Sequence, residues 1–251
     1  ATAIKILRRM NIIGIIPARY ESSRFPGKPL IDLKGKTMIQ RVYEGAKKST
    51  KLSEVIVATD DQRIYDHVKS FGGEVIMTSE NHKNGTDRCG EVASQMDCDV
   101  VINIQGDEPL VDFRQLDQLC KAFNDSDVSI ATLGIKGVTR EERNNPNRIK
   151  IVLDENSNAL YFSRSAIPNT ANGKPEIIEN FPLYRHVGLY AYKSGTLAEL
   201  IDLPPTQLEK VESLEQLRWL YYSYKVRVVE TDIETPNIDV PEDLKKVLAF
   251  L

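Results

Sequence analysis

The stretch IIGIIPARYESSRFPGKPL, residues 12–30, joins an apolar run to a loop that is rich in cations. The run from Ile12 to Pro17 is typical of a buried strand. The loop that follows it carries Arg19, Arg24 and Lys28. Three cations in so short a segment repel one another unless an anion lies between them. The stretch therefore predicts a strand that ends at a binding site for an anion.

Short β-rich runs alternate with helical patterns along the rest of the chain. We expect strands at Ile12–Pro17, Glu54–Thr59, Glu74–Thr78, Asp99–Gln105, Val128–Leu133, Ile149–Leu153, Ala159–Ser163, His186–Tyr192 and Val226–Glu230. We expect helices at Thr37–Ser49, Gln62–Phe71, Thr86–Gln95, Phe113–Asn124, Gly195–Ile201, Leu208–Tyr222 and Glu242–Phe250. Alternating strands and helices in the first half imply right-handed crossovers, and consecutive strands in the second half imply that the sheet becomes mixed there. The predicted fold class is α/β, a single large domain with a mixed, mainly parallel sheet flanked by helices.

Two segments stand apart from this pattern. Residues 1–9 precede Met10 and lack the long apolar core of a signal peptide, so we expect an extension or tag without function, followed by one domain over residues 10–251. The segment IPNTANGKPEIIENFPLY, residues 167–184, contains three prolines and few apolar residues. A long excursion of this kind between strands is usually a lid, a substrate loop or an oligomer contact.

Composition and charge limit the classes of function. The 251 residues carry a formal net charge of −3, so no general basic field points to nucleic acid as a partner. No apolar run approaches the roughly 20 residues of a membrane span. The three cysteines, Cys89, Cys98 and Cys120, lack metal-ligand spacing, and a chain of this size needs no disulfides, which favours a reducing cytoplasm.

The cationic loop follows the first strand, so it lies at the carboxyl edge of the sheet, where folds of this kind bind ligands. Arg19, Lys28 and the loop amides could hold a polyphosphate; the alternative is a solvated basic loop. The tetrapeptide KGKT, residues 34–37, resembles the end of a Walker A loop, but Leu30 occupies the position of its first glycine. No G-x-G-x-x-G follows the first strand, which counts against a nicotinamide or flavin dehydrogenase.

Two acidic motifs are candidate metal ligands. In VVINIQGDEPLV, residues 100–111, Asp107 comes directly after an apolar strand. A carboxylate facing a phosphate site is a natural ligand for Mg²⁺, which takes few carboxylates together with phosphate oxygens and water. The alternative is that Asp107 caps the turn at Pro109. Asp239, in NIDVPEDL, is either a second ligand or a helix-start residue, depending on whether the fold brings it to Asp107.

Three further motifs hold candidate binding residues. In NHKNGTDR, residues 81–88, the amides of Gly85 and Thr86 could bind the polar edge of a base or simply start a helix. In LYFSRSAIP, Arg164 ends a strand and could fork onto a carboxylate. In RHVGLYAY, His186 lies on a strand, where a structural role is common.

An acidic pattern marks the expected helix Leu208–Tyr222. Glu212, Glu215 and Gln216 share one face of that helix by their i,i+3 and i,i+4 spacing. The usual explanation of such a face is that it is solvated. The sharper one is that it binds a hydroxyl-rich ligand.

These motifs, taken together, resemble the 3-deoxy-manno-octulosonate (Kdo) cytidylyltransferase family from about Met10 to the C-terminus. The resemblance rests on IIPARYESSRFPGKPL, VATD, GTDR, NIQGDEPL, KIVLDENSNALYFSRSAIP, RHVGLYAY, LEKVESLEQLR and IDVPEDL, which follow one another in order. It implies a nucleotide-diphospho-sugar transferase fold, usually a homodimer. It also implies an enzyme that joins CTP to Kdo and releases pyrophosphate, for lipopolysaccharide synthesis.

The resemblance also assigns roles by position. The residues implied to hold the CTP triphosphate are Arg19, Ser23, Arg24 and Lys28, and those implied beside the cytosine and ribose are Gly85, Thr86 and Arg88. The residues implied to surround the sugar acid are Gln105, Arg164, His186, Tyr190, Glu209 and Gln216. Asp107 and Asp239 would hold Mg²⁺, and Arg19, Lys28 and Asp107 would carry the catalysis. Residues 160–225 would supply the sugar site and the dimer contact.

The chain departs from the family pattern at Asn84, where serine is expected, and at Asp87, where glutamate is usual. Two other functions stay open on the sequence alone. One is a cytidylyltransferase for another acidic sugar, such as a sialic acid or an amino analogue of Kdo. The other is a nucleotide-sugar binding module without enzyme activity. The motifs contain no compelling protein base, so we expect the metal to activate the sugar hydroxyl.

Overall fold

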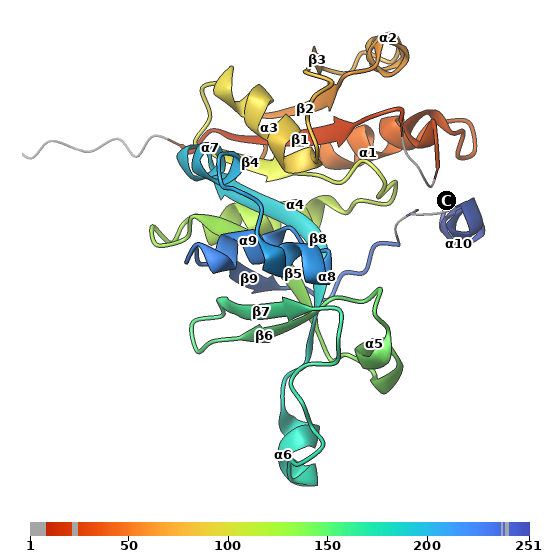
Figure 1. Cartoon of the computed structure of the whole chain (residues 1–251). Coiled ribbons are helices and arrows are strands. Elements are labelled where there is room, and N and C mark those ends of the chain that lie inside the picture. Colours follow the sequence, from red (N-terminus) through yellow and green to blue (C-terminus); the bar gives the residue numbers. More distant parts are fainter. Residues whose placement is uncertain (1–8, 22–24, 237, 239–240) are drawn as a thin grey trace, which may run out of the picture.

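All nine strands expected from the sequence form in the computed structural model, which describes residues 9–21, 25–236, 238 and 241–251. They are β1 (Ile12–Ala18), β2 (Glu54–Thr59), β3 (Val75–Met77), β4 (Val100–Asn103), β5 (Ile130–Lys136), β6 (Lys150–Leu153), β7 (Ala159–Ser163), β8 (Tyr184–Lys193) and β9 (Arg227–Glu230). All belong to one sheet, which confirms the α/β class (Figure 1).

The sheet is mixed, and its parallel part comes from the first half of the chain. Its order is β3-β2-β1-β4-β8-β5-β9, with β6 and β7 off this path. Strand β1 pairs in parallel with β2 on one side and with β4 on the other. Strand β8 then runs antiparallel between β4 and β5. The order therefore reverses between β1 and β4, whose carboxyl ends diverge into separate loops.

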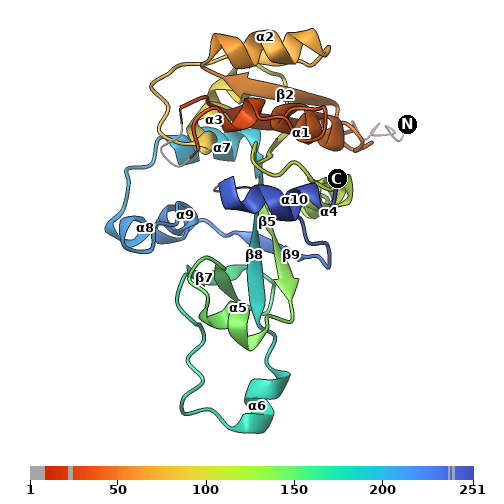
Figure 2. The ribbon, with the colours of Figure 1, turned by 90° about the vertical axis from the view of Figure 1, so that its right-hand side faces the viewer.

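Helices cover both faces of the sheet. The α-helices are α1 (Met38–Ala46), α2 (Gln62–Ser70), α3 (Gly85–Ser94), α4 (Phe113–Ala122), α5 (Arg140–Asn144), α6 (Pro175–Asn180), α7 (Ser194–Ile201), α8 (Gln207–Glu212), α9 (Gln216–Tyr221) and α10 (Leu244–Leu248). Two short 3₁₀ turns, η1 (Lys28–Leu30) and η2 (Pro241–Asp243), complete the described elements. Figure 2 shows α8 and α9 on one side of the sheet and α4 on the other. Within the described residues, no helix is long and apolar enough to span a membrane.

The apolar run of β1 is explained by this double covering. Ile12 and Ile16 belong to the core cluster under α1, α2 and α4, whereas Ile13 and Ile15 belong to the cluster under α3, α7 and α9. Successive side chains of a strand point to opposite faces, so a strand covered on both faces needs apolar residues throughout. At about 25 cal/mol per Å², burying these side chains is a main source of stability.

The expected helix Leu208–Tyr222 is wrong, because the chain breaks it into α8 and α9 at Ser213. Ser213 has a left-handed backbone (φ 52°). The carboxylate of Glu212 accepts hydrogen bonds from Ser163 Oγ (2.6 Å) and from the amide of Arg164 (3.0 Å) at the end of β7. The guanidinium of Arg164 in turn donates to the carbonyl oxygens of Glu212 and Ser213. A contact with a distant strand therefore ends the helix, and the acidic residues around the break do not share one face.

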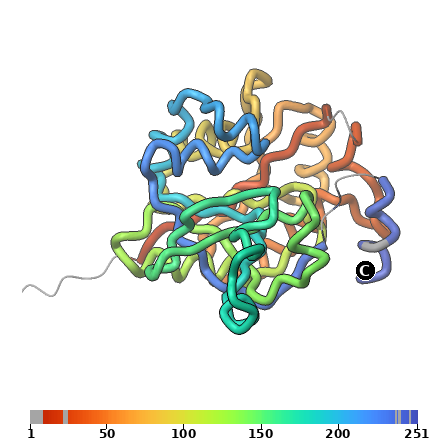
Figure 3. The backbone as a smooth tube through the Cα atoms, turned by 60° about the horizontal axis from the view of Figure 1, so that its bottom comes forward, coloured from red at the N-terminus to blue at the C-terminus, as the bar shows by residue number. Residues whose placement is uncertain are grey.

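The excursion between β7 and β8 forms an arm that leaves the body of the molecule. It contains α6, which the sequence analysis did not predict, and Figures 1 and 2 show α6 at the far end of the molecule. Ile177 and Phe181 on this arm are exposed (61% and 40%). Figure 3, with this end turned toward the viewer, shows the arm and the β6–β7 hairpin in front of the sheet.

Candidate active site

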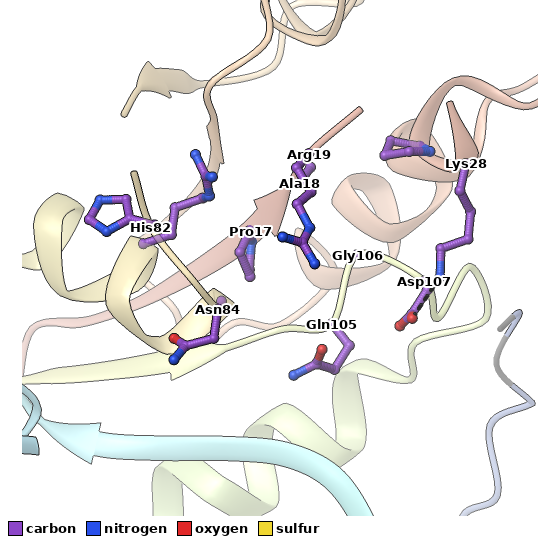
Figure 4. A pocket seen from close by; sticks show the side chains of 12 residues that line it. Pro17, Ala18, Arg19, Lys28, His82, Asn84, Gln105, Gly106 and Asp107 are labelled. Atoms are coloured by element: carbon purple, nitrogen blue, oxygen red, sulfur yellow. Dashed lines mark hydrogen bonds and ion pairs between the residues drawn. The ribbon is translucent and has the colours of Figure 1, made fainter. Parts of the chain in front are cut away.

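A cavity of about 230 Å³ lies at the carboxyl ends of β1 and β4. This is where the strand order reverses, which is the general position of ligand sites in open α/β sheets. The cavity is lined by Pro17, Ala18, Arg19, Lys28, Pro29, His82, Asn84, Gly85, Arg88, Gln105, Gly106 and Asp107 (Figure 4). The structure therefore brings together the cationic loop, the GTDR segment and the QGDEP segment.

Cations and an anion face each other across this cavity. In Figure 4, Arg19 extends from the end of β1 into the space above Gln105, and Lys28 extends toward Asp107. Lys28 Nζ lies 2.9 Å from Asp107 Oδ2 and donates a second hydrogen bond to the carbonyl oxygen of Ile238 (2.9 Å). Ser23 and Arg24, the other two residues expected here, lie outside the described residues.

Gly106 holds the two strand ends close together. A Cβ at this position would lie 2.8 Å from the carbonyl oxygen of Pro17, which is backbone and cannot rotate away. Only glycine allows the loop after β4 to pass so near the end of β1. This contact sets the spacing between Arg19 on one side of the cavity and Gln105 and Asp107 on the other.

The opposite wall is the start of α3. Asn84 caps this helix by accepting a hydrogen bond from the amide of Asp87 (2.8 Å). Helix α3 begins at Gly85, whose backbone lines the cavity. The motif is therefore a helix cap that also lines the cavity, and its binding of a base stays a prediction. The positive end of a helix dipole favours anions or the polar edge of a base here.

Arg88, on the same helix, also lines the cavity. It is 3% exposed, and its guanidinium donates to the carboxylate of Asp60 (2.6 Å) after β2 and to the hydroxyl of Thr78 after β3. These two partners fix the position of the guanidinium. Arg88 ties the ends of β2 and β3 to α3 as well as lining the site.

His82 is a site residue that the sequence analysis missed. It lines the cavity, and its ring nitrogen Nε2 contacts the carboxylate of Glu91 on α3. Glu91 also accepts a hydrogen bond from the amide of Ser79 (2.9 Å), so the loop before α3 is tied to the helix itself. His82 lies inside the NHKNGTDR motif, so the sequence did contain a signal for it. Its partner Glu91 lies nine residues further along the chain, outside that motif.

A second cavity of about 340 Å³ adjoins the first, and the two share Gln105 and Asp107. It is lined by Gln105, Asp107, Glu108, Ile135, Asn147, Arg148, Ile149, Arg185, His186, Val187, Gly188, Tyr190 and Thr235. The structure thus brings three of the expected sugar residues together here, namely Gln105, His186 and Tyr190. Two cations, Arg148 and Arg185, were not expected from the sequence.

The charges of these two arginines differ in availability. Arg185 is buried and pairs with Glu142 (3.2 Å) and with Glu234. Arg148 is exposed and lines the cavity. An anionic group entering the cavity therefore meets the exposed charge of Arg148, which also acts on Glu142, whereas Arg185 already pairs with two acids.

His186 is neutral at physiological pH. Burial, and then the neighbouring charge of Arg185, lower the pKa of His186 to about 3. Its Nε2 lies 2.9 Å from the hydroxyl of Thr132, and its ring packs against Tyr190 (5.2 Å between centroids). Such an imidazole is a very weak base, so it serves as a polar wall of the cavity rather than as a proton acceptor.

Three expected sugar residues line neither cavity. Arg164 donates its guanidinium to backbone carbonyl oxygens at the α8–α9 break and at Pro146. Glu209 caps α8 and accepts two hydrogen bonds from Arg218, at 2.7 and 2.6 Å. Gln216 is buried on α9. In this structure the polar groups of Arg164 and Glu209 are therefore used within the protein.

Glu215 departs most from the expected solvated face. Its carboxylate accepts a hydrogen bond from Thr86 Oγ1 (3.2 Å), and burial raises the pKa of Glu215 to about 7. Thr86 is the second residue of α3, so this contact joins the α8–α9 region to the helix that walls the first cavity.

The chain with this fold belongs to the cytidylyltransferases, because the cytidylyltransferase family model matches residues 13–230. The chain is 50% identical to 3-deoxy-manno-octulosonate cytidylyltransferase of Parabacteroides distasonis over 250 residues, covering 96% of this chain and 98% of that protein. It is 51% identical to the protein of the same name from Bacteroides thetaiotaomicron over 249 residues, with 96% and 98% covered. The chain therefore belongs to the 3-deoxy-manno-octulosonate cytidylyltransferase family.

A solved structure agrees with this assignment. It is CMP:2-keto-3-deoxy-manno-octonic acid synthetase complexed with CTP, 42% identical, with a TM-score of 0.90. The match covers 96% of this chain and 98% of the solved chain. The nucleotide-diphospho-sugar transferase fold expected from the sequence is therefore confirmed.

Proposed function

We propose that this chain transfers the cytidylyl group of CTP to the 2-hydroxyl of Kdo, giving CMP-Kdo and pyrophosphate, the activation step for lipopolysaccharide synthesis. The observation that carries the proposal is the pair of adjoining cavities that share Gln105 and Asp107. A reaction between two bound substrates needs two sites that meet at the reacting atoms. The names of the curated relatives and of the CTP-bound structure supply the two substrates.

The bonds exchanged define what the first cavity must do. The oxygen of the sugar's 2-hydroxyl forms a bond to the α-phosphorus of CTP, the bond from that phosphorus to the β-phosphate oxygen breaks, and the hydroxyl loses its proton. Negative charge grows on the leaving pyrophosphate. Arg19 and Lys28 lie where they can balance that charge, and the start of α3 lies where it can receive the base and ribose.

The second cavity is the proposed acceptor site. Kdo carries a carboxylate next to the reacting hydroxyl, and Arg148 is an exposed cation that lines this cavity, whereas Arg185 is buried and pairs with two acids. Gln105 can donate to and accept from the sugar hydroxyls, and the neutral ring of His186 presents a polar edge. This arrangement orients the hydroxyl without offering a strong protein base.

We infer that Mg²⁺ is the cofactor and that Asp107 is one of its ligands. The described residues hold no group of three metal-ligating side chains, and the second expected ligand, Asp239, lies outside them. A site completed by phosphate oxygens and water suits Mg²⁺, which binds through one or two carboxylates. The ammonium of Lys28 already rests on Asp107, so this carboxylate is placed to stabilise a cation. When bound, Mg²⁺ would neutralise phosphate charge and lower the pKa of the sugar hydroxyl.

We also propose that the chain works as a homodimer. Ile177 and Phe181 are exposed on the arm around α6, which offers apolar surface for a second copy. The three cysteines are free, in keeping with a reducing compartment such as the cytoplasm. Mass measurement in solution tests the dimer directly.

Pyrophosphate release tests the proposed function. Wild-type protein is incubated with each of CTP, UTP, ATP and GTP, paired with Kdo, an amino analogue of Kdo or a sialic acid. We expect release with CTP and Kdo far above every other pair. Release that is fastest with a sialic acid would move the acceptor assignment, and no release with any pair would leave only a binding module.

A further inference from the structure

The contact between Lys28 and Asp107 links three segments that are distant in the chain. Lys28, the last cation of the cationic loop, is the first residue of the turn η1, and Asp107 follows β4. Lys28 also donates to the carbonyl oxygen of Ile238, whose own amide donates to the carbonyl oxygen of Asp107 (3.0 Å). The side chains of Lys28 and Asp107 are 14% and 26% exposed, so this ion pair is partly removed from water. Such a pair is stronger than one at the surface.

The same ammonium has two possible anionic partners during the reaction. It lines the first cavity, where a triphosphate would lie, and it rests on the carboxylate that we take for a metal ligand. A divalent ion on Asp107 would meet the positive charge of Lys28 at short range, and like charges repel. Both cations fit beside Asp107 only when a further anion, such as the triphosphate, lies between them.

We propose that Lys28 occupies the cation position of Asp107 until the nucleotide arrives, so that the divalent metal and CTP bind together. The inference rests on the proposed function, because it takes Asp107 for a ligand of the metal that accompanies CTP. Free protein then binds the metal weakly. The triphosphate draws Lys28 away from Asp107 and exposes the carboxylate to the metal. By reciprocity, the metal strengthens nucleotide binding by the same factor.

This role differs from a purely structural one in the direction in which metal affinity changes when the charge of Lys28 is removed. If Lys28 only held Asp107 in position as a ligand, removing its charge would weaken metal binding or leave it unchanged. If Lys28 competes with the metal, removing its charge strengthens metal binding to the free protein. The loss of one charge-assisted contact corresponds to a gain of about ten- to a hundredfold.

The test is the affinity of the nucleotide-free protein for Mn²⁺, measured by paramagnetic resonance, with Mn²⁺ standing in for Mg²⁺. Lys28→Met should bind Mn²⁺ at least about tenfold more tightly than wild type. Lys28→Arg keeps the charge and should show no gain, and Asp107→Asn added to Lys28→Met should abolish the gain. Lys36→Met is the matched control, because Lys36 pairs with Glu44 on the surface away from the cavity. It should bind like wild type.

A substitute variant and a second measurement make the result decisive. If Lys28→Met does not fold, Lys28→Gln replaces it, since an amide can keep the hydrogen bonds without the charge. Equal or weaker Mn²⁺ binding in the folded neutral variant overturns the proposal. With CTP present, Asp107→Asn should bind less Mn²⁺ than wild type. If it does, and Lys28→Met shows no gain, the metal site stands and the competition fails. If Asp107→Asn binds Mn²⁺ like wild type, the metal assignment in the proposed function fails as well.

Discussion

Replacing Gly106 by alanine should disturb the site more than the addition of one methyl group at any other position in this region. The added Cβ would lie 2.8 Å from the carbonyl oxygen of Pro17, whereas ordinary contacts begin near 3.4 Å, so the two strand ends must separate by about 3.4 − 2.8 = 0.6 Å. Forcing a methyl group into packed structure costs about 1–3 kcal/mol. In a chain of this size, each kcal/mol lowers the melting temperature by about 2–4 °C.

The same substitution should also lower the rate of turnover, in addition to the loss of stability. The shift separates Arg19 at the end of β1 from Asp107 after β4, which act on the same nucleotide in the proposed mechanism. A misplacement of about 1 Å can cost roughly a hundredfold in rate, so we expect a loss of about ten- to a hundredfold. The assay is pyrophosphate release at saturating CTP and Kdo, together with the melting temperature.

Gly195→Ala is the matched control. Gly195 lies in helix α7, and nothing lies within 4 Å of an added Cβ there. Glycine costs a helix about 0.5–1 kcal/mol relative to alanine, so this variant should be slightly more stable than wild type and fully active. Wild-type stability and turnover in Gly106→Ala would refute the argument that backbone contact sets the spacing of the site.

Three other predictions concern the α8–α9 region and its contacts, and a fourth concerns Arg148 in the second cavity. Glu209→Gln removes one partner of a buried ion pair with Arg218, each side chain being 10% exposed, and should cost about 3–5 kcal/mol in urea unfolding; a loss below 1 kcal/mol would contradict this reading. Burial raises the pKa of Glu215 from 4.5 to about 7. Between these two pH values the folded protein binds a proton that the unfolded protein has lost, so the free energy of unfolding falls as the pH rises, by up to about 3 kcal/mol. Glu215→Gln should remove this dependence between pH 5 and pH 8, and an unchanged slope would count against the burial of the carboxyl. Arg164→Lys should lower stability by about 1–2 kcal/mol and leave the KM for Kdo unchanged, because its fork binds backbone carbonyls, whereas Arg148→Ala should raise that KM about tenfold. A raised KM in Arg164→Lys without a loss of stability would return Arg164 to the sugar site.

The strands and the position of the first cavity were predictable because both depend on local patterns. The β1 run is apolar at every position that meets a core, and the alternation of strands and helices implies parallel pairing. Parallel strands end at one edge, so the loops after β1 and β4 had to meet there. That reasoning brought Arg19, Lys28 and Asp107 together before any contact was known.

The α8–α9 region was not predictable, because long-range contacts determine it. The spacing of Glu212, Glu215 and Gln216 fits a helix, but Glu212 binds the end of β7 and the helix stops there. The same fold buries Glu215 beside Thr86, whereas helical spacing suggests a solvated face. Partners 49 and 129 residues apart leave no periodic signal in the sequence.

The missed cavity residues show the same limit. His82 lies inside the NHKNGTDR motif, yet its role depends on its contact with Glu91 across the start of α3. Arg148 follows a proline-containing turn with no motif of its own, and only the return of β8 past β6 brings it to the cavity that contains His186. The roles of such residues can be recognised only once the three-dimensional arrangement of the strands is known.

The stoichiometry of the reaction tests the central claim most directly. Wild-type protein, CTP, Kdo and Mg²⁺ are followed by ³¹P NMR, and the products are weighed by mass spectrometry. The account predicts one CMP-Kdo and one pyrophosphate for every CTP consumed, and no consumption of CTP when Kdo is omitted. Formation of CDP or orthophosphate as the primary product, or release of pyrophosphate without Kdo, would contradict attack of the sugar hydroxyl on the α-phosphorus.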